Sequence, residues 1–149
     1  MNENIYGVGV EELKIPLYST KKIRRCDGKL EFFQGAIGIN GDTYATTNMD
    51  LPCQLPKGRR YIVNGFEVQT NLQRDFFDSS YYRFFVGCKE YQHGRGINLI
   101  NNMESSFSNL LIESNQNFFA EINFNSKLQL NFTGVIIFII HGTMIRPIY

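Results

Sequence analysis

Six consecutive apolar residues, Val135-Ile-Ile-Phe-Ile-Ile140, stand near the C-terminal end of the sequence within the longer run GVIIFIIHGTM (residues 134–144). β-Branched and aromatic residues favour pleated strands, and a run this short is typical of a buried strand. The run shows no alternation of polar and apolar positions. A strand that is apolar on both faces must be covered on both, so we expect Val135–Ile140 to lie inside a sandwich with its edges paired.

The composition of the whole chain also favours strands. The chain has 149 residues, about one domain, and is long enough to bury a core without disulfides or metal. It contains 13 Phe and 8 Tyr, and only 19% of its residues are charged. Asparagine supplies much of the polarity of the C-terminal third, and asparagine builds turns but is poor in helix interiors. We therefore predict an all-β domain.

Individual strands can be placed from alternation and turn residues. The segment Arg60–Thr70, RYIVNGFEVQT, alternates on both sides of Gly65, which predicts a strand with a bulge at that glycine. The segment Tyr81–Tyr91 predicts a second strand, followed by a loop at Gln92–Gly96. Further strands are expected at Asn117–Phe124, Lys127–Phe132 and Gly134–Met144. The spacing of Leu99, Met103, Phe107, Leu110 and Leu111 resembles a helical stripe, which predicts one short helix near residues 99–111.

The first 45 residues have weak periodicity and scattered glycines. Short strands are expected at Glu31–Phe33 and Ala36–Ile39, within an extended arm that lies along its own domain or along a neighbouring subunit. This arm is also the candidate cover for the second face of Val135–Ile140. The predicted organisation is an N-terminal arm over residues 1–45 and a single jelly-roll-like domain over residues 46–149. The predicted fold class is an antiparallel β-sandwich or single jelly roll.

The distribution of charge limits the kinds of partner that the chain is expected to bind. The formal net charge is +1, which does not suit a general nucleic-acid binder, so contact with nucleic acid is expected only through the basic run formed by Lys21, Lys22, Arg24 and Arg25. A solvated segment is the alternative for that run. The three cysteines show no CxxC spacing, and no signal-peptide pattern opens the sequence, which favours a cytosolic or cytosol-assembled protein. The longest apolar run is too short to cross a bilayer, so we expect no membrane span.

No pattern of catalytic or metal-binding residues stands out. His93 and His141 are far apart in the sequence, and the carboxylates form no distinctive pair. Cys88 beside Lys89, with His93 five residues on, is more typical of a buried structural cysteine than of a nucleophile. We therefore expect no enzyme, no cofactor, and no catalytic, cofactor-binding or metal-binding residue. The segment His93–Gly96 is expected to be either a hairpin tip or an anion contact.

Two stretches resemble viral and phage capsid jelly rolls. Leu55–Thr70, LPKGRRYIVNGFEVQT, resembles their early strands, where a Pro/Gly turn leads into a bulged strand, and Gly134–Ile148, GVIIFIIHGTMIRPI, resembles their closing strand. The resemblance covers about the last two-thirds of the chain and carries no catalytic or binding residue. It implies a capsid, penton or cement subunit of a virion, assembled in the host cytoplasm, whose partners are copies of itself and other structural proteins.

Aromatic residues and arginine are the usual anchors of such interfaces. The interface residues expected on this basis are Phe76, Phe77, Tyr81, Arg146 and Tyr149. Ordinary core packing is the alternative for the aromatic residues. The alternative function is a carbohydrate- or ligand-binding sandwich, such as part of a receptor-binding fibre, in which aromatic side chains stack on sugar rings.

Overall fold

The apolar run Val135–Ile140 lies in the middle of a long strand, β9 (Leu128–Ile148), which has 21 residues. The structure is a computed structural model that describes residues 9–26, 28–34, 47–49, 51, 53–125 and 127–148. About two-thirds of the described part is strand with almost no helix, and every pairing between its named strands is antiparallel. Its helical content is two 3-10 turns, η1 (Arg74–Phe77) and η2 (Gly96–Leu99). The prediction of an all-β chain is confirmed.

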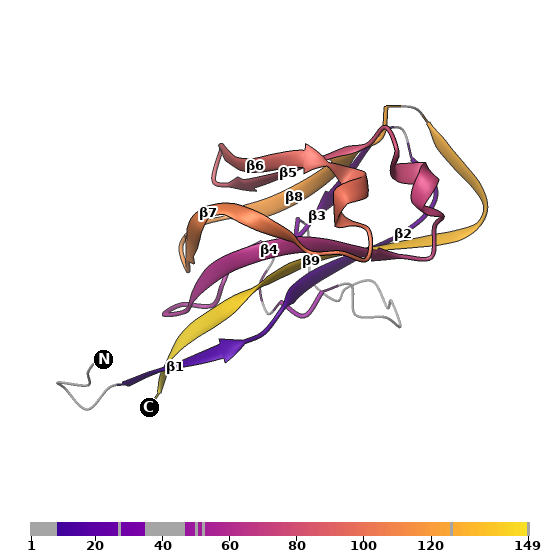
Figure 1. Cartoon of the computed structure of the whole chain (residues 1–149). Helices are drawn as coiled ribbons and strands as arrows, with labels where there is room; N and C mark the ends of the chain where they lie inside the picture. The colour runs from indigo at the N-terminus through magenta and orange to yellow at the C-terminus, as the bar shows by residue number, and fades with distance from the viewer. Residues whose placement is uncertain are drawn as a thin grey trace.

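The strands form two sheets that face each other (Figure 1). In the first sheet, β9 is flanked on one side by β1 (Gly9–Lys14) and β2 (Leu17–Cys26) and on the other by β4 (Arg60–Thr70), which pairs in turn with β7 (Glu104–Glu113). The second sheet has the order β3-β8-β5-β6. Its strands are β3 (Lys29–Phe32), β8 (Phe118–Asn123), β5 (Tyr81–Val86) and β6 (Lys89–Arg95).

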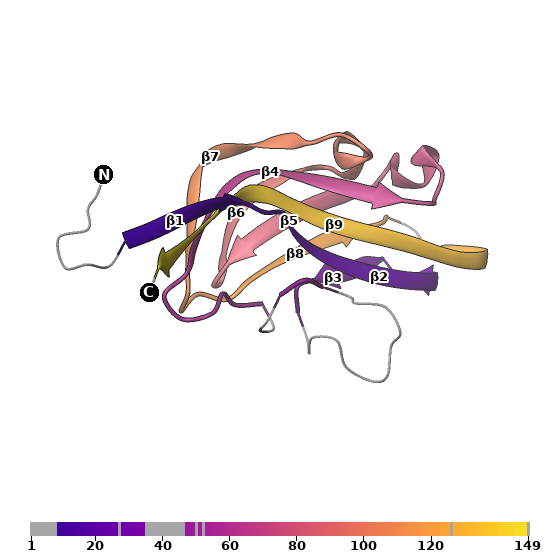
Figure 2. The ribbon, with the colours of Figure 1, turned by 90° about the horizontal axis from the view of Figure 1, so that it is seen from below.

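The pairing between strands is nested along the chain. Strand β2 pairs with β9, β3 with β8, β4 with β7, and β5 with β6. The earliest of these strands therefore meets the latest, and the innermost two form a hairpin. Strand β1 pairs with the end of β9, where residues 143–145 also pair with β4. Beyond that point, residues 9–11 and 146–148 form a two-stranded ribbon, here called the β1–β9 ribbon, which projects from the sheets in Figure 2.

The core lies between the sheets and is built from aromatic rings. The Phe138 ring on β9 has its centroid 5.4 Å from that of Phe32 on β3 and 6.1 Å from that of Phe66 on β4. It also contacts Tyr82 of β5, and all four side chains are fully buried. Rings from both sheets thus meet at Phe138. The apolar run of β9 therefore forms the centre of the core between the two sheets.

The N-terminal segment contributes strands to the first sheet. Strands β1 and β2 pair along the edge of β9 instead of lying over its face. The cover that we expected from residues 1–45 is therefore an edge partner, where these residues are described. Ile136, Phe138 and Ile140 face the core, whereas Val135 and Ile137 on the opposite face are half-buried. The strand expected at Ala36–Ile39 lies outside the described residues.

The helix predicted near residues 99–111 is wrong. Leu99 belongs to η2, and the following residues form strand β7, which pairs with β4. Leu110 and Ile112 face the core and Leu111 points outward, which is the period of a strand. Serine and asparagine give this segment little intrinsic helix preference, so pairing with β4 decides its conformation. The helical stripe in the sequence was a coincidence of spacing.

The strand β4 was predicted with its observed ends, and its bulge is confirmed. The register against both neighbours shifts between Val63 and Gly65. A Cβ atom at Gly65 would lie 2.7 Å from the carbonyl oxygen of Glu104, so a larger residue does not fit there. Other strand limits were wrong: Tyr81–Tyr91 is split into β5 and β6 by a turn at Gly87, whose φ is +63°, and the two last predicted strands are one strand, β9.

Candidate functional site

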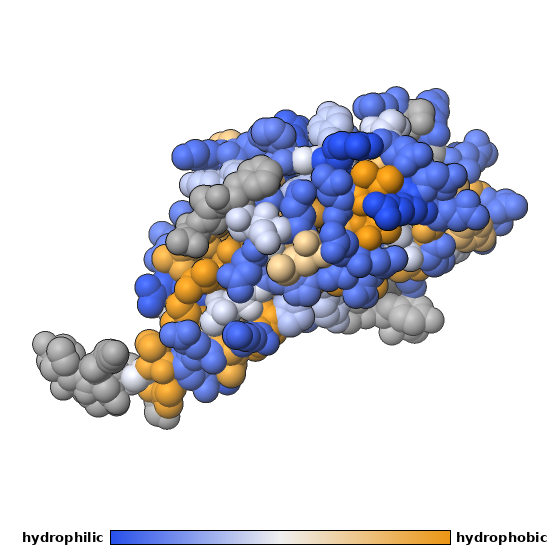
Figure 3. All heavy atoms as spheres, in the orientation of Figure 1, coloured by the Kyte–Doolittle hydropathy of each residue, from blue (hydrophilic) through white to orange (hydrophobic). Residues whose placement is uncertain are grey.

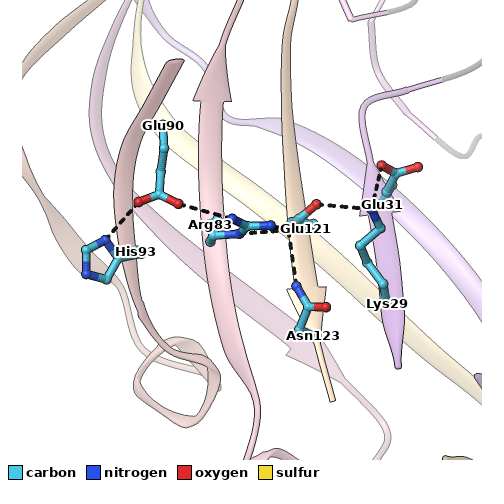
Figure 4. A network of polar contacts seen from close by, with 7 residues as sticks. All are labelled: Lys29, Glu31, Arg83, Glu90, His93, Glu121 and Asn123. Carbon is cyan, nitrogen blue, oxygen red and sulfur yellow. Dashed lines mark hydrogen bonds and ion pairs between the residues drawn. The ribbon is translucent and has the colours of Figure 1, made fainter. Parts of the chain in front are cut away.

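The outward face of the second sheet carries a row of charged side chains that crosses all four strands. Register places Glu31, Glu121, Arg83 and His93 side by side on β3, β8, β5 and β6. Figure 4 shows contacts running along this row from Lys29 to His93. Opposite charges on neighbouring strands stabilise a sheet when they face each other directly, as Arg83 and Glu121 do.

Glu121 is the most buried member of this charged row, with only 2% of its surface exposed. Arg83 Nε donates a hydrogen bond of 2.8 Å to Glu121 Oε1, and Arg83 Nη2 contacts the same oxygen. Asn123 Nδ2 donates to that oxygen at 3.1 Å, and Lys29 Nζ lies 3.7 Å from Oε2. A carboxylate withdrawn from water remains charged only when such partners compensate its lost hydration. The hydrogen bond with Glu121 in turn raises the pKa of Arg83.

Aromatic rings support the same guanidinium. The Cζ atom of Arg83 lies 5.1 Å from the centroid of the Phe85 ring, a cation–π distance. Phe85 stacks on Phe119 of β8, with ring centroids 4.7 Å apart and planes within 14° of parallel. Glu90 Oε1 approaches Arg83 Nη1 at 3.5 Å from the β6 side. Arg83 is therefore held by a buried carboxylate, a ring and a second carboxylate.

A shallow hollow of about 450 Å³ opens beside Arg83. Small-molecule sites usually have volumes of about 300–1,000 Å³. The hollow is lined by Tyr81, Arg83, Glu90, His93, Gly94 and Arg95. Together these residues offer cationic donors, one carboxylate and one aromatic ring, which is a set of groups suited to holding a polar ligand.

The described residues do not gather a metal centre. Where side chains are placed, no group of three or more His, Cys, Asp or Glu comes together. The other histidine pairs with a carboxylate on the first sheet, where His141 Nε2 lies 2.7 Å from Glu67 Oε1. Cys88, which was expected to be buried, is instead exposed in the β5–β6 turn, and burial raises the pKa of Cys53.

The interface residues expected from the sequence fall in different places. Phe77 shows the core packing that was the alternative to an interface contact: its side chain is fully buried, and its ring centroid lies 5.5 Å from that of Phe124. Phe76 is half-buried against the core. Tyr81 is 42% exposed and lines the hollow. Arg146 pairs with Glu11, its cross-strand neighbour in the β1–β9 ribbon.

The remaining expected contacts can be placed only in part. Tyr149 lies outside the described residues. The basic residues Lys21, Lys22, Arg24 and Arg25 lie on β2, a strand of the first sheet, and not on a free tail. The contact of this run with nucleic acid stays a prediction. Among the described residues, no helix is long and apolar enough to cross a membrane.

Sequence reasoning missed Arg83, Glu90 and Glu121 as partners. Alternation within YYRFFV and NFFAEINF does place Arg83 and Glu121 on the polar sides of their strands. The pairing of β5 with β8 brings them together, and a register between strands so distant in sequence cannot be read from alternation. Within the segment His93–Gly96, for which an anion contact was one alternative, His93, Gly94 and Arg95 line the hollow and belong to β6, not to a loop.

No model of a known protein family matches the chain. No curated protein sequence matches it either. The fold and the groups that it exposes are therefore the basis for assigning a function.

Proposed function

We propose that the chain is a jelly-roll subunit of a virion or similar protein assembly, such as a capsid, penton or cement protein. The nested strand pairing carries this proposal. A jelly roll has eight strands in two facing sheets, as though a long hairpin of four strand pairs had been wound up. The four pairs from β2–β9 inward to β5–β6 follow this order. The order supports a jelly roll, and viral capsid proteins are prominent users of that architecture.

The β1–β9 ribbon is the proposed contact with a neighbouring copy. It projects from the sheets, and hydrophobic residues lie on its surface in Figure 3. Val10 on β1 is 55% exposed and Ile148 on β9 is 48% exposed. Large apolar side chains at a projecting tip are readily covered by another subunit. Other members of the assembly would meet the remaining faces, with Tyr81 and Arg146 as proposed anchors.

Charge substitution in the ribbon tests the proposal. We expect Val10→Glu and Ile148→Glu to lower the mass of the particle measured by native mass spectrometry, since a carboxylate in an apolar contact opposes association. Phe132→Glu is the matched control, because Phe132 is 41% exposed near the other end of β9. Loss of the assembled species in the ribbon variants alone supports the proposal. Equal masses for all variants and the unchanged chain would overturn the ribbon contact.

A second candidate function is ligand binding, for instance by a module of a receptor-binding fibre. The observation that favours it is the hollow beside Arg83, where Tyr81 presents an exposed ring among charged groups. Lectin domains also use jelly rolls, so the same fold supports either function. Saturation-transfer NMR with a set of sugars distinguishes the two: transfer to any sugar supports the ligand-binding candidate, and its absence removes it without affecting the assembly proposal.

A further inference from the structure

We propose that the hollow beside Arg83 binds a sugar residue that carries a carboxylate, presented at the end of a glycan. The proposal rests on the ligand-binding candidate and names its ligand class. It follows from three groups that line the same hollow: the ring of Tyr81, the guanidinium of Arg95, and the fixed pair of Arg83 and Glu90.

Tyr81 supplies the surface against which a sugar ring packs. It occupies an outward position at the start of β5 and is 42% exposed, whereas the next residue, Tyr82, is fully buried. An aromatic ring presents a flat apolar face with a polar hydroxyl at one end. Pyranose rings have one face of C–H groups and a rim of hydroxyls, so they match such a surface better than a compact inorganic anion does.

Arg95 supplies the cation that points to an acidic sugar. It lies directly opposite Tyr81 across the β5–β6 ladder. Its only polar contact within the described residues is a long one, 3.4 Å from Nη2 to the carbonyl oxygen of Asp78. Arg83, by contrast, is engaged with Glu121 and Glu90. The guanidinium of Arg95 is therefore available for a paired, two-point contact with a carboxylate.

Arg83 and Glu90 supply hydrogen-bonding groups that are already in position for the sugar hydroxyls. The burial of Glu121 behind Arg83 fixes the guanidinium before any ligand arrives, which reduces the ordering cost of binding. Glu90 contacts both Arg83, at 3.5 Å, and His93 Nδ1, at 3.1 Å, so its carboxylate is held as an acceptor at the rim. Donors and an acceptor at fixed positions select a ligand with several hydroxyls over a simple carboxylate.

Saturation-transfer NMR on the full chain tests the ligand class directly. The probes are the methyl glycosides of N-acetylneuraminic acid and of glucuronic acid, the methyl esters of both, methyl galactoside, and acetate. We expect transfer to one or both acidic glycosides, and binding at least about tenfold weaker for the corresponding ester, because the charge-assisted contact with Arg95 is lost. Acetate should displace the acidic glycosides only poorly, because it has no sugar ring to pack against Tyr81.

Two variants and a control locate the site. Arg95→Gln and Tyr81→Ala should each weaken binding of the acidic glycoside by about tenfold or more. Arg74→Gln, an exposed arginine on η1 outside the hollow, should leave binding unchanged. Because all three side chains are exposed, the variants should keep the melting temperature of the unchanged chain.

Each of the other outcomes of these measurements would overturn a defined part of the proposal. Equal binding of neutral sugars and esters would overturn the acidic-sugar assignment while leaving the ligand-binding candidate in place. Acetate binding as tightly as the acidic glycosides would also overturn it, since the site would then be one for simple anions. Silence with every probe would remove both the assignment and the ligand-binding candidate.

Discussion

At the scale of single residues, the main finding is a carboxylate buried on the outward face of a sheet. Alternation alone places Glu121 among the exposed positions of β8, and its side chain would be solvated there if its neighbours were small. Arg83, Asn123 and Lys29 close around it instead. The sequence therefore predicts the face on which Glu121 lies but not its burial, because burial depends on which long side chains the neighbouring strands bring.

The first prediction concerns this ion pair. Arg83→Ala leaves Glu121 buried with fewer partners, and we expect it to lower the free energy of unfolding by about 1–3 kcal/mol, a range that allows for the partial exposure of Arg83. Removing both charges with Arg83→Met and Glu121→Leu should restore part of that loss. Urea unfolding compares the unchanged chain with Arg83→Ala, Arg83→Met, Glu121→Leu and the double variant, with Arg74→Ala as the control. A double variant less stable than the sum of its single changes would contradict the account.

The second prediction concerns two buried tyrosines. Burial raises the pKa of Tyr61, whose hydroxyl lies 2.5 Å from the carbonyl oxygen of Ile15. Burial, and then the hydrogen bond with Glu104, raises the pKa of Tyr82. The unfolded pKa of tyrosine is about 10. A raised folded pKa stabilises the fold fully below that pH, and the contribution is lost as the pH rises further.

The free energy of unfolding should therefore fall above about pH 10, and part of this fall should vanish in Tyr61→Phe and Tyr82→Phe. Near neutral pH each variant should lose about 1 kcal/mol because its hydroxyl contacts are removed. Urea unfolding at a series of pH values checks both effects. The same alkaline dependence in all three chains would contradict the assignment of the raised pKa values to these residues.

At the scale of elements, sequence patterns predicted strands well where alternation and turn residues agree. Strand β4 and its bulge at Gly65 are the clearest case. The segment of β7 was assigned to a helix because the spacing of its apolar residues fits both the helical period and the strand period. Its pairing with β4 determines that it is a strand. Strand β9 was divided at Thr133-Gly134, although its pairing with β2 continues on both sides of this point.

The third prediction concerns the glycine that faces the bulge from β9. Gly142 pairs with Val63, and a Cβ atom there would lie 2.0 Å from the carbonyl oxygen of Ile62 and 2.6 Å from the Tyr61 ring. Backbone must move to admit it, so Gly142→Ala should lower the free energy of unfolding by about 3 kcal/mol or prevent folding. Asn64→Ala, an exposed change within the bulge, should have an effect below about 0.5 kcal/mol. Thermal unfolding of both variants compares their stabilities, and equal melting temperatures would contradict the close packing around Gly142.

At the scale of the whole molecule, the two sheets are held together by aromatic rings that meet at Phe138. Its neighbours come from β3, β4 and β5, so a single side chain joins strands of both sheets. The sequence predicts that Val135–Ile140 is buried, but it does not identify which residue lies at the crossing. That identity depends on the packing of one sheet on the other.

The fourth prediction follows from this position. Phe138→Ala should lower the free energy of unfolding by about 3–5 kcal/mol, because the cavity touches both sheets. Phe132→Ala, on the same strand but 41% exposed, should change it by less than about 1 kcal/mol. Chemical denaturation of the two variants measures the difference. Similar losses for both would show that Phe138 does not hold the sheets together.

The proposed role of this fold in a protein assembly can be tested on the chain itself. The most direct measurement is sedimentation velocity of the unchanged full chain over a wide range of concentrations. The account predicts discrete species larger than a monomer that gain population as concentration rises and that Val10→Glu removes. A single monomeric boundary at every concentration, unchanged by the substitution, would contradict it.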